Sequence, residues 1–404
     1  MIQADTLKAG WKLVKFGDVV RLSKDRATNP EAEGIERYVG LEHIDPDDLR
    51  IRRWGLVAEG TTFTSKFKPR QVLFGKRRAY QRKVAVADFE GVCSGDIYVF
   101  ESANPKVLLS ELLPFICQTE RFSEYAVGTS AGSLSPRTNW ASLANFEFFL
   151  PPLEEQKRIT KLINTVEKTN NELKLARDLA EKLRKSLLIN IFNNLMSSGS
   201  IELPLLGITT DCNRIKVEQA GSVLMGRQLS PKYKTGLFSR PYLRVANVFD
   251  GYIDIKEVYE MDFSDVEFET FKLSRGDILL NEGQSRELVG RSAIYRNDVE
   301  NCCFQNTLIR FRPAQTVIPE YAHYYFQYSQ YTGRFVQIAK QTTSIAHLGV
   351  QRFAAMQFPL IDINIQKEIV KILLNAVQTI SKLNQRIESA KYIKKYTLNE
   401  ILKM

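Results

Sequence analysis

Two long stretches of the chain carry apolar residues at alternating steps of three and four, the spacing of a helix that packs along another helix. Neither stretch holds Gly or Pro inside, and both are flanked by charged residues. Two ordinary core helices are the alternative, but core helices rarely sustain four or more heptads. We therefore expect the two helices to pack on each other, antiparallel because a whole domain separates them. The seam positions are Ile159, Leu162, Val166, Leu173, Leu183 and Leu187 in the first stretch and Leu373, Ile380, Leu383 and Ile387 in the second.

The order of elements occurs twice along the chain, at an offset of about 205 to 210 residues. In each half an apolar segment (residues 69–74 and 274–280) precedes a polar loop and a second strand-like segment. An amphipathic stretch, a Gly/Ser/Thr loop (residues 128–135 and 341–344) and a short proline-bearing strand follow, and the long helix closes the half. This order indicates a diverged duplication.

Each half before its helix mixes short alternating strands with one or two helices, which predicts an α+β fold. Strands are expected at residues 38–41, 84–87, 242–245 and 291–295. The predicted architecture is two repeated domains of mixed α and β structure, separated by two long antiparallel coiled-coil-like helices. The expected divisions are a first domain at 1–150, a first helix at 151–197, a second domain at 198–357 and a second helix at 358–404.

The composition favours a nucleic-acid partner. With 404 residues and 44% hydrophobic residues the chain can bury the cores of several domains, and 56 Lys and Arg against 46 Asp and Glu give a net charge of +10. The five cysteines show no metal-ligand spacing, so we expect no metal site. The chain has no apolar run of about 18 residues and no apolar leader, so we expect a soluble, cytoplasmic protein.

Motifs for catalysis are missing from the sequence. We find no phosphate-binding loop of the GxxxxGK[ST] type, no Asn- or Asp-Pro-Pro-aromatic tetrapeptide of an amino-methyltransferase, no nuclease metal motif and no nucleophile elbow. For the three histidines, His43, His323 and His347, a structural or surface role is favoured over catalysis. We therefore expect no catalytic site in this chain.

Residues 66–83, which we call the basic run, contain eight basic residues and no acidic one. Lys and Arg neutralise DNA phosphates, an Arg fork matches guanine O6 and N7, and Gln pairs with an adenine edge. A solvated loop of surface charges is the alternative. The candidate DNA-binding residues of the basic run are Lys66, Lys68, Arg70, Lys76, Arg77, Arg78, Tyr80, Gln81, Arg82 and Lys83.

The matching loop of the second half is less basic, and the two Gly/Ser/Thr loops offer hydroxyl and N–H groups suited to phosphates or base edges. Simple turns would use the same residue types. The further candidate DNA-binding residues are Ser130 and Ser133 in the first half and Gln284, Ser285, Arg286, Arg291, Lys340, Thr342 and Thr343 in the second.

Residues 150–159, LPPLEEQKRI, resemble the signature that enters the first conserved helix in specificity subunits of type I restriction–modification systems. Residues 37–41, RYVGL, and 128–135 also fit that family. The second copy, residues 359–367, is looser. The resemblance covers nearly the whole chain.

The resemblance implies that each domain is a target recognition domain that reads one half of a bipartite, asymmetric DNA site. The helices would set the spacing and dock two methyltransferase subunits, which would carry the S-adenosylmethionine chemistry, and nuclease or translocase subunits could join them. This chain itself would need no cofactor. Three alternatives remain: an autonomous DNA-binding regulator with a coiled-coil spacer, an unfamiliar nuclease, and the specificity subunit of a modification-only or phage-exclusion system.

Overall fold

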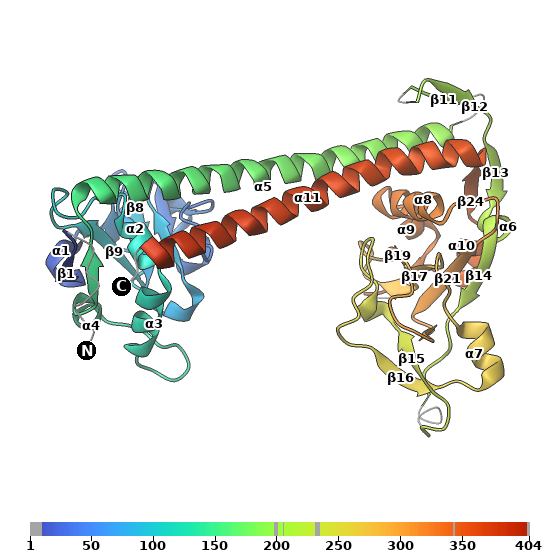
Figure 1. The fold of residues 1–404 in the computed structure, drawn as a ribbon, viewed down its shortest axis with the longest axis horizontal. Helices are drawn as coiled ribbons and strands as arrows, with labels where there is room; N and C mark the ends of the chain where they lie inside the picture. Colours follow the sequence, from blue (N-terminus) through green and yellow to red (C-terminus); the bar gives the residue numbers. More distant parts are fainter. Residues whose placement is uncertain (1–9, 198–200, 205, 231–234, 342–343, 402–404) are drawn as a thin grey trace. The chain divides into compact units, whose positions relative to one another are not determined.

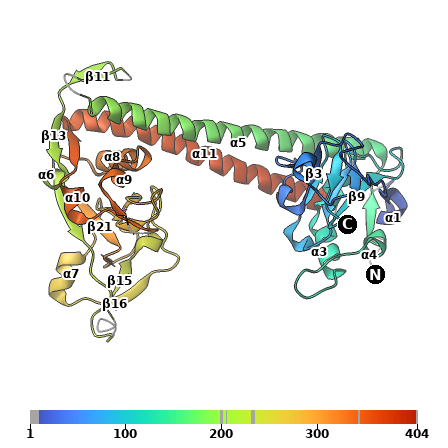
Figure 2. The same cartoon turned by 180° about the vertical axis from the view of Figure 1, so that it is seen from behind.

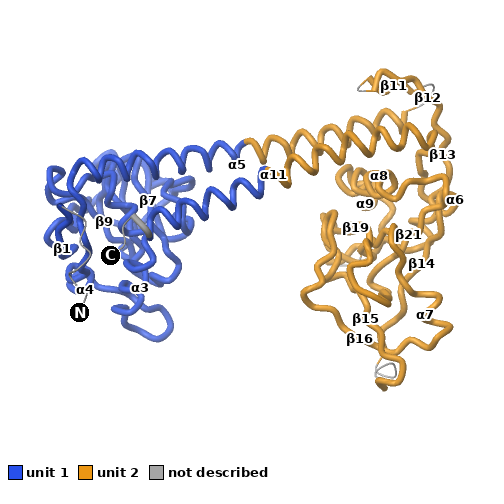
Figure 3. Tube along the Cα trace, viewed as in Figure 1, with its two compact units in different colours: residues 1–175, 383–404 blue, residues 176–382 orange. Residues whose placement is uncertain are grey.

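The computed structural model describes residues 10–197, 201–204, 206–230, 235–341 and 344–401 (Figure 1). The chain divides into two compact units, Met1–Leu175 with Leu383–Met404 and Ala176–Lys382 (Figure 3). Both long helices, α5 (Leu153–Leu195) and α11 (Ile363–Ile401), contribute segments to each unit. Within the described residues, no helix is both long and apolar enough to cross a membrane.

Unit 1 contains two four-stranded sheets and a two-stranded pair. One sheet has the order β2-β9-β6-β7 and is antiparallel throughout, whereas in the other, β4-β3-β8-β5, strands β3 and β8 run parallel. In the pair, β1 lies antiparallel to β10, the strand that leads into α5. The bounds are β1 Lys12–Lys15, α1 Phe16–Val19, β2 Val20–Leu22, β3 Arg37–Val39, β4 Gly55–Leu56, β5 Ser65–Phe67, β6 Val72–Gly75, β7 Val84–Val86, β8 Gly91–Cys93, β9 Ile97–Ser102, α2 Leu113–Cys117, α3 Glu120–Gly128, α4 Trp140–Ala144 and β10 Glu147–Leu150.

Unit 2 repeats this plan with its own sheets, of order β14-β21-β17-β19 and β16-β15-β20, the latter with β15 and β20 parallel. Here β13 pairs with β24, the strand that leads into α11. A small additional sheet has the order β18-β23-β22. The bounds are β11 Ile201–Leu203, β12 Ile208–Thr210, β13 Asn213–Lys216, α6 Val217–Ala220, β14 Gly221–Met225, β15 Ser239–Leu243, β16 Tyr259–Asp262, α7 Asp265–Phe271, β17 Ile278–Asn281, β18 Gly283–Gln284, β19 Ser292–Ile294, β20 Cys303–Phe304, β21 Leu308–Pro313, α8 Pro319–Tyr331, α9 Arg334–Ile338, β22 Lys340–Gln341, β23 Ala346–His347, α10 Val350–Ala354 and β24 Gln357–Leu360.

The predicted mixture of strands and helices in two repeated domains is confirmed. The four expected strands correspond to β3, β7, β15 and β19, each within a few residues of the predicted bounds. The strand-like segments that match between the halves take the same places in two corresponding sheets. These segments are β6 and β9 in the β2-β9-β6-β7 sheet of unit 1 and β17 and β21 in the β14-β21-β17-β19 sheet of unit 2. The duplication read from the sequence is therefore a duplication of topology.

A buried glutamine fastens the start of α5 to the rest of unit 1. Gln156 is 1% exposed. Its Oε1 accepts a hydrogen bond from the N–H of Leu109 at 2.8 Å, and its Nε2 donates to the carbonyls of Val107 and Pro151, both at 2.8 Å. One side chain thus satisfies three backbone groups at the junction between the sheet and the helix.

Gln366 makes the same three contacts in unit 2. It is 0% exposed, its Oε1 accepts from the N–H of Ile318 at 2.9 Å, and its Nε2 donates to the carbonyls of Thr316 and Ile361, both at 2.9 Å. The amide fits because it carries a donor and an acceptor on one planar group. The Gln of the LPPLEEQKRI segment, Gln156, therefore has a structural role in attaching the helix to its domain, and Gln366 has the same role in the second copy.

Replacing Gln156 by Leu is expected to destabilise unit 1 by about 3 kcal/mol, since it leaves three backbone groups without their side-chain partner, at roughly 1 kcal/mol each. Urea unfolding followed by tryptophan fluorescence checks this, because Trp11, Trp54 and Trp140 all belong to unit 1. The exposed Gln385 provides the control, and Gln385→Leu should unfold at the wild-type urea concentration. Equal urea midpoints for the two variants would contradict a stabilising role for the Gln156 hydrogen bonds.

The two long helices run antiparallel within each unit (Figures 1 and 2). In unit 1, Ile159 near the start of α5 shares a buried cluster with Leu398 near the end of α11. In unit 2, Phe192 near the end of α5 shares a cluster with Leu373 near the start of α11. The antiparallel arrangement expected from the heptad spacing is confirmed.

The seam of α5 differs from the predicted one at two positions. Leu162 is 47% exposed and Leu183 is 69% exposed, whereas the neighbouring Ile163 is buried. Near its ends α5 packs on the globular parts as well as on α11, and a helix with 3.6 residues per turn drifts from a strict heptad. At the second position it is Arg184 that turns toward α8 of the same unit, where its guanidinium donates to Tyr331 Oη at 3.2 Å. Leu183, one residue earlier, therefore points away.

The other predicted seam positions face the interior to different degrees. Ile159, Leu373 and Ile387 are at most 3% exposed. The partly buried ones are Val166, Leu173, Leu187, Ile380 and Leu383. Beyond Ala390 the seam continues through a polar contact, in which Lys394 pairs with Glu167 of α5.

Candidate nucleic-acid interface

In unit 1 the part of the basic run that follows β6 meets the segment after the first Gly/Ser/Thr loop. The chain leaves β6 at Gly75, and Arg77 then forms an isolated antiparallel bridge with Arg137. The backbone N–H of Arg78 donates to the Pro136 carbonyl at 2.7 Å. Two segments singled out separately in the sequence thus form one surface.

An aspartate organises the cations of this surface. Asp96 accepts hydrogen bonds from Arg77 Nη1 at 3.2 Å and from Arg137 Nε at 2.8 Å. Burial alone would raise the pKa of Asp96, but these two guanidinium groups outweigh it and hold that pKa below its usual value. Ser135 Oγ accepts from Arg77 at 3.1 Å and from Arg78 at 3.2 Å. Asp96 holds Arg77 and Arg137 in place, and its single negative charge does not cancel their two positive charges.

The sequence interpretation missed Arg137, which completes this cluster. Its signal was present, because Arg137 comes two residues after the end of the first Gly/Ser/Thr loop, but it stands 60 positions from Arg77. We use the name basic cluster for Lys76, Arg77, Arg78 and Arg137. The Lys76 amine lies 4.7 Å from the centroid of the Tyr98 ring, a cation–π distance.

The tip of the basic run carries an exposed aromatic ring. Arg78 and Arg82 both have left-handed backbone conformations, with φ of 53° and 55°, on either side of a single 3-10 turn, Ala79–Gln81. Such φ values are uncommon outside glycine, and here they fold the chain sharply. Tyr80, in the middle of the turn, is 54% exposed. The turn therefore presents a ring beside the basic cluster.

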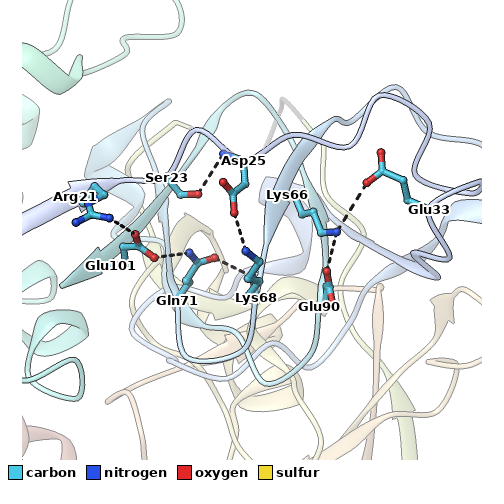
Figure 4. A network of polar contacts seen from close by, with 9 residues as sticks. All are labelled: Arg21, Ser23, Asp25, Glu33, Lys66, Lys68, Gln71, Glu90 and Glu101. Carbon is cyan, nitrogen blue, oxygen red and sulfur yellow. Dashed lines mark hydrogen bonds and ion pairs between the residues drawn. The ribbon is translucent and has the colours of Figure 1, made fainter. Parts of the chain in front are cut away.

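Two early members of the basic run lie in ion pairs within the domain (Figure 4). Lys66 Nζ is 2.9 Å from Glu90 and 3.8 Å from Glu33. Lys68 Nζ is 2.8 Å from Asp25, and hydrogen bonding to that carboxylate raises the pKa of Lys68. A DNA phosphate would have to compete with these carboxylates, so both lysines are weaker candidates than the basic cluster.

Arg82 and Lys83 are also engaged inside unit 1. The Arg82 guanidinium lies 3.2 Å from Asp47 and 2.8 Å from Glu120, and Lys83 Nζ donates to the Leu41 carbonyl at 2.6 Å. These contacts join the basic run to neighbouring loops. Both residues lie beyond the turn that carries Tyr80, and their side chains serve the fold of the domain.

The remaining candidates of unit 1 are spread over the surface. Arg70 is exposed, with a φ of 74°, and Gln81 is partly buried. In the Gly/Ser/Thr loop, the Ser130 hydroxyl donates to the Ala126 carbonyl at 2.8 Å, while Ser133 is exposed. Of these, Ser133 is available to an external partner in the loop next to the basic cluster.

Unit 2 brings its corresponding segments together in the small sheet. Gln284 on β18 lies opposite Ala346 on β23, and Lys340 on β22 lies opposite His347 on β23. Both polar segments that matched the first half by order thus border one sheet. The second half therefore repeats the meeting of two loops, through strand pairing.

The other candidates of unit 2 have mixed environments. Arg286 is exposed and Ser285 is partly buried beside Gln284. Arg291 packs inward, with its guanidinium 4.6 Å from the centroid of the Phe249 ring, and burial lowers its pKa. Arg291 is therefore a packing residue at the edge of β19. The predicted residues Thr342 and Thr343 lie outside the described residues.

The three histidines have structural partners. His43 accepts a hydrogen bond from the backbone N–H of Gly40 at 3.0 Å. His323 is buried against the Ser292 carbonyl at 3.0 Å, and burial lowers the pKa of its imidazole. His347 lies 2.9 Å from Glu282. Among the residues whose placement is described, no group of three or more His, Cys, Asp and Glu side chains could hold a metal ion.

Comparisons of sequence identify relatives of this chain. The EcoKI specificity subunit of Escherichia coli K12 is 23% identical over 392 residues, which cover 92% of this chain and 82% of that protein. The putative MjaX specificity subunit of Methanocaldococcus jannaschii is 27% identical over 175 residues, 43% of this chain. The chain spans 41% of the length of the MjaX subunit and 35% of the EcoDI subunit of Escherichia coli.

Solved structures share the fold. A chain from a structural study of complex assembly and conformational transition in a type I restriction–modification system has a TM-score of 0.66 at 18% identity, covering 98% of both chains. The S subunit of such a system from M. genitalium has a TM-score of 0.55 at 13% identity, again over 98% of both chains. At these identities the likeness concerns the fold. The family described as the type I restriction modification DNA specificity domain matches residues 8–180 and 232–392, more than half of the chain, and the protein therefore belongs to the family of type I restriction–modification specificity subunits.

Proposed function

We propose that each unit reads one half of a bipartite, asymmetric DNA site for a type I restriction–modification complex. The observation that carries this proposal is the repeated meeting of two polar segments, at the basic cluster in unit 1 and at the β18-β23-β22 sheet in unit 2. Two copies of one recognition plan that have diverged in side chains suit two half-sites of different sequence.

The chemistry of unit 1 suits a DNA groove. The basic cluster neutralises phosphates with release of counterions, and a guanidinium fork of Arg77 or Arg78 can address the O6 and N7 edge of guanine. Asp96 pre-organises Arg77 and Arg137, which lowers the conformational entropy lost on binding. The recognition surface of unit 2 is less basic, so polar groups such as Gln284 and Ser285 contribute more of its contacts.

The long helices are proposed to set the gap between the half-sites and to dock methyltransferase subunits. They contain 43 and 39 residues, and each added residue lengthens a helix by about 1.5 Å. Leu179 and Leu183 of α5 are 56% and 69% exposed, one turn apart, as expected for a face that a partner covers. Two methyltransferase copies would suit two repeats, and they would bind S-adenosylmethionine.

The chain is proposed to be a non-catalytic member of that complex. Purified chain, purified cognate methyltransferase subunit and their mixture would be incubated with DNA and radiolabelled S-adenosylmethionine. We expect site-specific adenine methylation in the mixture and background incorporation with either component alone. Methyl transfer by the isolated chain would contradict the proposal. Methylation by the partner alone with the same sequence preference would contradict it equally.

A further inference from the structure

Unit 1 contains a cavity of about 600 Å³ that lies apart from the basic cluster and borders the polar end of the helix seam at Lys394. The loop 45–48 forms one wall, the segment that joins α2 to α3 forms another, and α5 and α11 complete it. All of these segments belong to unit 1. A volume of this size is within the range of pockets that hold small molecules.

Two side chains in the wall of this cavity have buried amide atoms without a hydrogen-bond partner in the described part of the chain. Gln118 is 5% exposed, and neither its Oε1 nor its Nε2 has a hydrogen-bond partner among the described residues. Asn170 of α5 is 7% exposed, and its Oδ1 likewise has no hydrogen-bond partner among the described residues. Buried amides without partners cost free energy, and both of these line the same cavity. Their placement points to an external group that hydrogen-bonds to them.

The position of the Gln118 amide is held by its own backbone. The Gln118 carbonyl accepts a hydrogen bond from Arg82 Nη2 at 2.8 Å. The same guanidinium lies 2.8 Å from Glu120, which also pairs with Lys395 of α11 at 2.9 Å. A network of ion pairs therefore fixes the chain on either side of the amide, while the amide itself makes no hydrogen bond to the described residues of that network.

The cavity also has an apolar face and charged groups of both signs. Pro46 and the buried Leu398 supply apolar surface. Four carboxylates also line the cavity, Asp45, Asp47, Asp48 and Glu120. Four of its five cations lie in ion pairs: Arg82 with Asp47 and Glu120, Lys391 with Glu388, Lys394 with Glu167 and Lys395 with Glu120. Lys174 is the lining cation outside these ion pairs, and it is therefore the candidate for holding a phosphate. The basic residues that line the cavity are Arg82, Lys174, Lys391, Lys394 and Lys395.

We propose that this cavity binds a nucleotide, with the base edge on the Gln118 amide and the phosphate on Lys174. A nucleobase edge presents a donor beside an acceptor, which is the complement of a primary amide, as in the pairing of Gln with adenine. The flat base would lie against Pro46 and Leu398, and Asn170 Oδ1 would accept from an exocyclic amine. The nucleotide is either free in solution or part of a DNA strand. This inference does not rest on the proposed function.

Calorimetric titration of the full chain, without DNA, tests the proposal with four probes, the monophosphates of adenosine, guanosine, cytidine and uridine. We expect saturable one-site binding for at least one of them, tighter than for inorganic phosphate, with a matching rise in Tm. Gln118→Met keeps the length of the side chain and removes its hydrogen bonds. It should weaken nucleotide binding by about tenfold or more while leaving Tm without ligand unchanged or higher.

A second pair of variants on α5 separates the phosphate contact from a general loss of charge. Lys174→Met should weaken the monophosphate but not the corresponding nucleoside, and the exposed Lys161→Met, outside the cavity, should change neither. Displacement of the bound monophosphate by a single-stranded oligonucleotide would assign the site to a DNA strand, and its absence would assign it to a free nucleotide. No saturable binding, equal binding of inorganic phosphate, or full binding by Gln118→Met would overturn the proposal.

Discussion

Replacing Lys76 and Arg77 by Ala and Arg78 by Gly is expected to weaken DNA binding about tenfold or more and to flatten its salt dependence. The slope of log K against log salt is negative, and each lost phosphate contact reduces its magnitude by about 0.9, so three lost contacts reduce it by up to about 2.7. Gly is chosen at position 78 because Arg78 has a φ of 53°, which Ala adopts poorly. Binding titrations between 50 and 200 mM salt, with the assembled complex, measure both quantities.

Lys66 and Lys68 provide a matched control from the same basic run. Both are tied to carboxylates of their own domain, so Lys66→Ala with Lys68→Ala should leave the salt slope close to that of the wild type. If Arg77 or Arg78 reads a guanine, the triple variant should also lose about 1–3 kcal/mol of discrimination at one base pair. A triple variant with unchanged salt slope and unchanged affinity would show that the basic cluster does not contact DNA.

The sequence predicted the large features because they depend on local patterns. The heptad spacing determines two long helices, and the repeated order of apolar and polar segments determines two copies of one topology. Gln156 and Gln366 lie in segments that correspond between the two halves of the sequence. Their hydrogen bonds reach 47 and 48 residues back along the chain.

The details of the interface could not be predicted, because the contacts that decide them join residues far apart in the sequence. Nothing near Lys68 in the sequence indicates Asp25, 43 residues away, which neutralises it. Arg137 joins Arg77 through a strand-like contact that no local pattern indicates. In the same way, Leu183 fits the heptad, but Arg184 is the residue that reaches Tyr331.

Exchange of residues 12–150 for the corresponding domain of another specificity subunit is expected to replace one half-site and to leave the other unchanged. The boundaries suit the fold, since β1 begins at Lys12 and pairs with β10, which ends at Leu150. Gln156 then remains in the helix, and its bonds to backbone atoms at Val107 and Leu109 can form with an incoming domain of the same fold.

Methylome sequencing of cells that carry this chimera with its cognate methyltransferase tests the central claim, that each unit reads its own half of the DNA site. Cells carrying the wild-type chain and the same methyltransferase provide the reference motif. We expect a bipartite motif in which one half is new, the other half is that of the wild type, and the gap between them is the same. A stable, active chimera in which both halves change, or in which neither changes, would contradict two independent readers.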